Sequence, residues 1–278
     1  MSDLLDQVAA VLESAPLMQI PARNLSESDA FKLMMDLVEL EQITLFDKIV
    51  RDKSGKITSH KPGMQTKIIP EIAGIPFLKA SGTNNGNNGS AGATQQKYFA
   101  PTPSFAIVLF KLAVMLRDDW QATQVVYGGI GAGGSPGVTD CHMTGRCMDF
   151  YGADTNKGTF DVRKDWWLRP VYDSAGNLHP SEGNGWGVDR WKDETKTWYR
   201  LATSPKPEDA NAADFFAAIY EFAHEQARAE AFDINPHEFS AGSLLKMGWI
   251  IHPDYPRKLG KGGREKHNDH MHFQLGNT

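Results

Sequence analysis

Cysteine is scarce in this chain of 278 residues, which contains only two. Small secreted domains held together by disulfides use many more, so the fold is not built on a disulfide framework. The two cysteines, Cys141 and Cys147, lie six positions apart and bracket a histidine. We expect both to be small buried thiols.

Long apolar runs and an excess of positive charge are absent as well. No run approaches the roughly 20 apolar residues of a membrane-spanning helix. The net charge of −5 does not suit nucleic-acid binding, which usually needs a basic surface. The N-terminal stretch MSDLLDQVAAVLESA is acidic and lacks the apolar core of a secretory signal. We therefore expect no membrane span, no nucleic-acid partner and no export by the Sec route.

Apolar residues recur at helical spacing in several segments, and others alternate as strands do. A helix is expected to begin near Ser26 or Ser28 and to run to Val50. Further helices are predicted at residues 4–12, 103–120 and 209–230. Strands are predicted within residues 57–80, 124–130, 147–151, 248–255 and 270–275. Helices combined with mostly antiparallel strands indicate the α+β class.

Two segments have an unusual composition. Ser81 to Gln96 (SGTNNGNNGSAGATQQ) has no charge and almost no apolar side chain, so burial cannot repay its ordering. We take 81–97 as a linker between a mainly helical region, 1–80, and a main domain, 98–278; a long loop inside one domain is the alternative. Residues 152–207 look irregular and contain five of the seven tryptophans. These rings either stabilise a region poor in core or form a substrate wall.

The motif HNDHMHF brings three of the nine histidines together, from His267 to His272. Residues two apart on a strand face the same way, so His270 and His272 should present both imidazoles to one side. By itself this H-x-H pattern is weak evidence for a metal site.

The motif DCHMTGRCMDF strengthens that evidence. It places His142 on a loop and Asp149 on the strand that follows, so both can converge on one cation. A third ligand from the C-terminal strand would leave the fourth position to water. Such a set of nitrogen and oxygen ligands with one open position is typical of catalytic zinc.

These motifs resemble the signature of the LAS zinc peptidases, His-x-x-Gly-x-Ala-x-Asp followed much later by His-x-His. That group includes D-Ala-D-Ala carboxypeptidases, phage endolysin peptidases, penicillin-insensitive murein endopeptidases and the hedgehog signalling domain. HMTGRCMD matches with Cys147 in the usual place of alanine, and HNDHMHFQL looks most like the murein endopeptidase branch. The resemblance spans roughly residues 100–278, although only the two short motifs are specific.

The resemblance implies a small antiparallel-sheet core with one Zn²⁺ held by His142, Asp149 and His272. Asp269 or His270 would act as general base, and His267 or His270 would steady the oxyanion. Two departures stand out. Asp269 replaces the usual glutamate, and no arginine lies between Arg117 and Arg146, where carboxypeptidases of the group place a clamp for the terminal carboxylate.

The expected function is therefore a zinc-dependent endopeptidase that cuts the peptide cross-links of peptidoglycan. Its partners would be peptide stems and, because it would reach the periplasm or cell wall without Sec, a delivery machine and an immunity protein. A phage lysis protein or an effector of a contractile injection system fits this description, with residues 1–80 as a docking or delivery segment. The alternatives are a D,D-carboxypeptidase, a zinc amidase or esterase acting elsewhere, and a non-catalytic, zinc-stabilised binding module.

Overall fold

The computed structural model describes residues 16–80, 93–131, 141–165, 210–227, 249–251 and 270–276. The helix expected at 4–12, most of the Gly/Asn-rich segment and the tryptophan-rich residues 166–207 lie outside these ranges. Residues 267–269 of the HNDHMHF motif also lie outside these ranges.

The described strands form one mixed sheet, antiparallel at every pairing except β3 with β5. The strands are β1 (Ile43–Leu45), β2 (Ile68–Ile72), β3 (Ile75–Lys79), β4 (Thr94–Gln95), β5 (Ala122–Tyr127), β6 (Cys147–Thr155), β7 (Gly158–Asp161), β8 (Trp249–Ile251) and β9 (Met271–Gln274). Their order is β1-β2-β3-β5-β6-β9-β8, with β4 beside β3 and β7 beside β6. The architecture agrees with the predicted α+β class.

Strand β6 is the longest and lies at the centre of the pairing. Its first half, Cys147 to Phe150, pairs with β9, and its second half, from Gly152, pairs with β7. Its other edge pairs with β5. The Asp149 motif and the C-terminal His-x-His motif thus become neighbours through main-chain hydrogen bonds.

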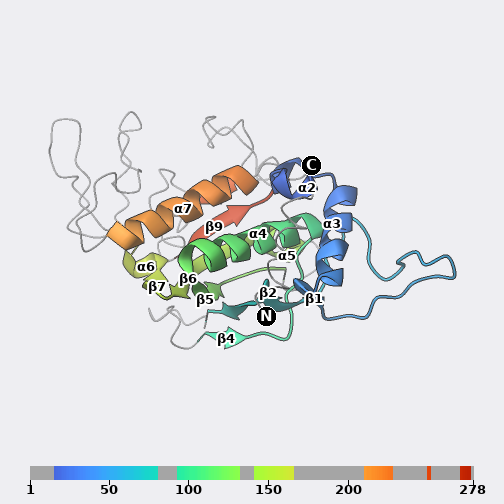
Figure 1. The fold of residues 1–278 in the computed structure, drawn as a ribbon, viewed down its shortest axis with the longest axis horizontal. Helices are drawn as coiled ribbons and strands as arrows, with labels where there is room; N and C mark the ends of the chain where they lie inside the picture. Colours follow the sequence, from blue (N-terminus) through green and yellow to red (C-terminus); the bar gives the residue numbers. More distant parts are fainter. Residues whose placement is uncertain are drawn as a thin grey trace.

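The helices are α2 (Pro16–Gln19), the 3-10 turn η1 (Ala22–Asn24), α3 (Glu27–Glu39), α4 (Pro103–Trp120), α5 (Cys141–Thr144), α6 (Val162–Asp165) and α7 (Ala210–Ala227). Helix α4 crosses the sheet with α7 alongside it and α3 packed near its N-terminal end (Figure 1). The Thr102 side chain caps α4 by accepting from the Phe105 amide, and Pro103 supplies the first turn. Most of α4 is buried, as its nearly continuous apolar sequence predicts.

The helix expected to run to Val50 ends at Glu39, so that prediction was wrong at its C-terminal end. Its start was right, because the Ser26 side chain caps the helix by accepting from the Asp29 amide. The chain then turns through Glu41, whose φ is 58°, and Ile43 pairs with Ile72 of β2. Pairing of the β-branched Ile43 in the sheet outweighs the helical periodicity.

Residues 152–165, expected to be irregular, also contain regular structure. Strand β6 continues to Thr155, and β7 and α6 follow it. Phe160 of β7 is buried against the rings of Trp120 and Phe215, and these contacts hold the strand against α4 and α7.

The sheet includes strands from both sides of the Gly/Asn-rich segment. Strand β3, which ends at Lys79, pairs with both β4 and β5. The segment before residue 81 therefore supplies strands to the same sheet as residues 122–155. The division into 1–80, 81–97 and 98–278 stays a prediction, and these shared strands give it no support. Among the described residues, no helix is both long and apolar enough to cross a bilayer.

A partly buried lysine joins three segments on the helical side of the sheet. The Lys111 ammonium donates to the Ile20 carbonyl at 2.7 Å and to the Gln226 side-chain oxygen at 3.2 Å. The same Gln226 oxygen accepts from the Ala22 amide. Burial lowers the pKa of Lys111 to about 8, against the partial opposition of Glu225. The folded protein therefore holds this proton less firmly than the unfolded chain does.

We predict that this lysine makes stability rise with pH in the alkaline range. Between its folded pKa of about 8 and its ordinary value of 10.5, the unfolded state binds more protons. The free energy of unfolding should gain about 1.5 kcal/mol between pH 8 and 9.5 from this group. Urea unfolding at several pH values measures it. Lys111→Met should abolish the rise and the exposed-lysine control Lys53→Met should keep it; an unchanged slope in Lys111→Met would refute the assignment.

Candidate metal centre

Because side chains alternate along β6 and β9, one face of the sheet carries core residues and the other carries the candidate ligands. The core face carries Met148, Phe150, Met271 and Phe273, all fully buried. The Phe273 and Phe150 rings contact Phe105 of α4 and Phe215 of α7, so these helices cover this face. The intervening residues, Cys147, Asp149, Tyr151 and His272, point to the other face.

The pairing of β6 with β9 sets Asp149 directly opposite His272. Opposed residues of an antiparallel pair lie on the same face with their Cβ atoms close together. The Nδ1 atom of His272 is 2.8 Å from Asp149 Oδ1. His270, two residues earlier, also faces this side, and its Nε2 is 3.4 Å from the same oxygen. The spacing of two in H-x-H predicted this shared direction.

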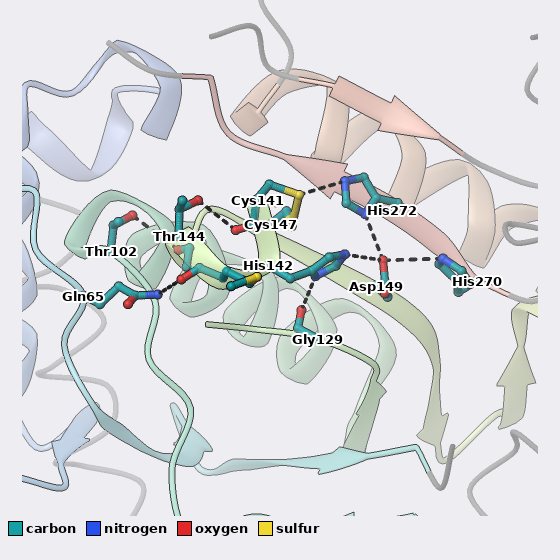
Figure 2. Close-up of a disulfide and its surroundings, with 12 residues drawn as sticks. Gln65, Thr102, Gly129, Cys141, His142, Thr144, Cys147, Asp149, His270 and His272 are labelled. Carbon is teal, nitrogen blue, oxygen red and sulfur yellow. Dashed lines mark hydrogen bonds and ion pairs between the residues drawn. A yellow bond between two sulfur atoms is a disulfide. The ribbon is translucent and has the colours of Figure 1, made fainter. Parts of the chain in front are cut away.

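His142 completes the cluster from the opposite side. It lies on α5, and its Nε2 is 3.3 Å from Asp149 Oδ1 (Figure 2). Its Nδ1 is 3.0 Å from the Gly129 carbonyl oxygen, which can only accept a hydrogen bond. That contact places a proton on Nδ1, so Nε2 is the nitrogen that faces the cluster, an orientation that the outer contacts of metal-binding histidines usually fix.

The turn that holds His142 is fixed by segments from both sides of the Gly/Asn-rich segment. Gln65 donates to the Met143 carbonyl at 2.6 Å, and the Thr102 amide donates to the Gly145 carbonyl at 2.8 Å. Gly145 has φ of +72°, and a Cβ there would lie 2.3 Å from the Ala100 carbonyl oxygen. Glycine is therefore required at this position of the motif for both its conformation and its close approach.

Asp149 is the negative centre of the cluster. Burial by itself would raise its pKa, but hydrogen bonds from His142 and His272 and the nearby charge of His270 hold the pKa well below its ordinary value. The carboxylate therefore stays ionised at neutral pH. Burial lowers the pKa of His272, and the hydrogen bond to Asp149 opposes this only in part. Neutral imidazole and ionised carboxylate are the forms that bind a cation.

Solvent reaches the cluster from the His142 side. The side chains of His270 and His272 are 8% and 7% exposed, whereas that of His142 is 24% exposed. A water molecule or a substrate group can therefore approach the cluster past His142 without moving the sheet.

The cysteines differ from expectation, because Cys141 and Cys147 form a disulfide and are not free thiols. The turn through Gly145 brings their Cα atoms to 5.6 Å, within the range that a disulfide requires. The Cys141 sulfur also lies 3.5 Å from His272 Nε2. The sequence contained a signal only for Cys147, which precedes Asp149 by two on one strand and so shares its face.

Two overlapping sets of side chains could hold a metal ion. One consists of His142, Asp149 and His272, the ligands implied by the family resemblance. The other consists of Cys141, His142, Cys147 and His272, whose candidate ligand atoms all lie within 4.8 Å of one another. The disulfide occupies both sulfur atoms of the second set. With the disulfide formed, the first set is the one whose ligand atoms do not include a bonded sulfur.

The remaining predicted site residues have different outcomes. His270 joins the cluster, whereas His267 and Asp269 lie outside the described residues. Sequence reasoning missed Gly129, which contacts His142, and Tyr151, whose ring centroid lies 5.1 Å from that of His270. Neither has a motif of its own; Tyr151 could have been found from the spacing of two along the strand.

No model of a protein family matches this sequence, and no curated protein or solved structure matches it either. The resemblance to the LAS peptidases therefore stays a prediction from the two sequence motifs.

We predict that the protein, kept under non-reducing conditions, binds about one zinc ion per chain through two imidazoles and one carboxylate. Most of the metal should be lost from each of the variants His142→Ala, Asp149→Ala and His272→Ala, because two remaining protein ligands bind zinc only weakly. Elemental analysis of desalted protein measures this. His224→Ala, on the exposed side of α7, is the matched control, and circular dichroism checks folding. Full metal content in folded His272→Ala would show that another residue is the third ligand.

Proposed function

We propose that this protein is a zinc-dependent peptidase that cleaves the peptide cross-links of peptidoglycan. One observation carries the proposal: three imidazole nitrogens lie within 3.4 Å of a single ionised carboxylate oxygen on one face of a sheet. Three imidazoles with one carboxylate can serve as ligands and as a proton carrier at the same time.

The donor set favours zinc over the hard cations. Calcium and magnesium prefer sites made mainly of oxygen ligands, whereas zinc binds imidazole nitrogen together with carboxylate oxygen. Three protein ligands and a position open to water are typical of catalytic zinc and not of structural zinc. The partly exposed His142 side is where that open position would lie.

When bound, zinc would supply Lewis acidity, which lowers the pKa of a water molecule and polarises a carbonyl group. The protein's own residues would move the protons. His270 Nε2 lies next to Asp149 but is not among the expected ligands, so it can accept a proton from the attacking water and deliver it to the departing amine. Asp269 and His267 remain predicted partners in these steps.

The choice of a cross-link over a terminal residue rests on the missing clamp. A carboxypeptidase must bind the free carboxylate of its substrate, commonly with a bidentate arginine. Arg146, which lies within the HMTGRCMD motif, donates to the Gly276 carbonyl next to β9. That contact gives it a structural role at the end of the sheet. A site without an arginine from residues 118–145 suits a peptide that continues on both sides of the scissile bond.

We predict that His270→Ala keeps its zinc and loses catalysis. A general acid–base group is typically worth about 10²–10⁴ in rate, so kcat should fall by that factor. Zinc content and cleavage of purified sacculi, followed by chromatography of the fragments, measure the two effects separately. His224→Ala again serves as control. Loss of zinc from His270→Ala with retention in His272→Ala would require the two roles to be exchanged.

We also predict that zinc-loaded enzyme cuts cross-linked muropeptide dimers to monomers faster than it trims the terminal D-alanine from a monomeric pentapeptide. The physical reason is that residues 118–145, where carboxypeptidases of the group place the clamp, contain no arginine. Mass spectrometry of both reactions gives the two rates, and metal-depleted His142→Ala controls for contaminating hydrolases. Preferential release of D-alanine would identify a carboxypeptidase instead, and no reaction with either substrate would favour a binding module.

A further inference from the structure

The disulfide lies beside the metal-binding cluster, and His272 contacts both. The His272 ring lies between the two: Nδ1 is 2.8 Å from Asp149 Oδ1, and Nε2 is 3.5 Å from the Cys141 sulfur (Figure 2). Cys141 and Cys147 also enclose His142 within the loop that their bond closes. A change at the disulfide therefore acts on both histidine ligands.

Breaking the disulfide would create a second set of ligands beside the first, on the Nε2 side of His272. The ligand atoms of Cys141, His142, Cys147 and His272 are already within 4.8 Å of one another, so small side-chain shifts bring them around one ion. Two thiolates and two imidazoles make the closed, four-coordinate arrangement of structural zinc, which has no position for water. Thiolates are softer ligands than carboxylate and suit zinc well.

We propose that the Cys141–Cys147 pair is a redox switch that chooses between two metal sites. In the oxidised protein the ion is held by His142, Asp149 and His272 and keeps an open position. In the reduced protein the two sulfurs replace Asp149 and the water, and the site is closed and inactive. Both histidines remain ligands, and His272 changes from Nδ1 to Nε2.

The reduction is a two-electron exchange with a dithiol. Its thiolate attacks one sulfur of the Cys141–Cys147 bond, and its second thiol then displaces the mixed disulfide. The partner leaves as a disulfide, and its two electrons and two protons produce two thiols in the protein. These thiols release their protons to solvent when they bind the ion. Reoxidation by a disulfide of higher potential reverses each step.

The biological consequence rests on the proposed function. A peptidoglycan hydrolase made in a reducing compartment would hold its metal in the closed site and would open it only where disulfides form. The switch would thus tie activity to the oxidising compartment that contains the substrate.

Metal binding by Asp149→Asn tests the switch without any activity assay. The oxidised full-length variant should lose its metal, because the open site needs the carboxylate. After reduction with a phosphine it should bind one cobalt(II) ion and develop the charge-transfer absorption of cobalt–thiolate bonds. Wild type should show that absorption when reduced and lack it when oxidised. Its absence from both reduced proteins, with thiol titration confirming reduction, would overturn the proposal.

The double variant Cys141→Ser/Cys147→Ser provides the matched control. It should bind cobalt without thiolate absorption at any redox state, and its cleavage of sacculi should no longer respond to the phosphine. Wild type should lose activity on reduction and regain it on reoxidation. Equal activity of oxidised and reduced wild type would refute the redox switch but not the peptidase proposal. Cobalt–thiolate absorption in the reduced protein, without cleavage of sacculi in either redox state, would support the switch and refute the peptidase proposal.

Discussion

The antiparallel pairing of β6 with β9 is the constraint on which the rest of the site depends. It sets Asp149 opposite His272 and turns Met148 and Phe273 to the other side. The same register that buries the core therefore assembles the cluster. A slip of one residue would exchange the two faces, placing the carboxylate against α4 and α7 and the apolar side chains in the cluster. Stability and chemistry are specified by one set of main-chain hydrogen bonds.

Much of this arrangement could be predicted from the sequence, for local reasons. The long segments with helical apolar spacing at 103–120 and 209–230 predict helices because burial on one side is encoded in neighbouring residues. The spacing of two in H-x-H predicts a shared face for the same reason. The end of α3 at Glu39 could not be found in this way, because the pairing of Ile43 with Ile72 is a contact between distant residues. The periodicity of neighbouring residues carries no information about a distant strand that can pair with the segment.

The disulfide and the contact from Gly129 escaped prediction for a related reason. Six residues of separation allow two cysteines to meet or to diverge, and only the turn at Gly145 decides. The Gly129 carbonyl belongs to the main chain, so no side-chain motif announces its contact with His142. The catalytic roles of His267 and Asp269 stay predictions from resemblance. Motifs identify the side chains of a site well, and they leave out the main-chain groups that orient them.

The residues joined at Asp149 and His272 are 123 positions apart in the chain. Bringing such distant residues together costs loop-closure entropy, which local interactions cannot offset early in folding. An ion shared by the two strands would act as a reversible cross-link across that long loop. By mass action, such an ion stabilises the folded state by about 4 kcal/mol at a thousand times its dissociation constant. Chelation would then loosen the pairing of β9 with β6 and expose both strands to proteases.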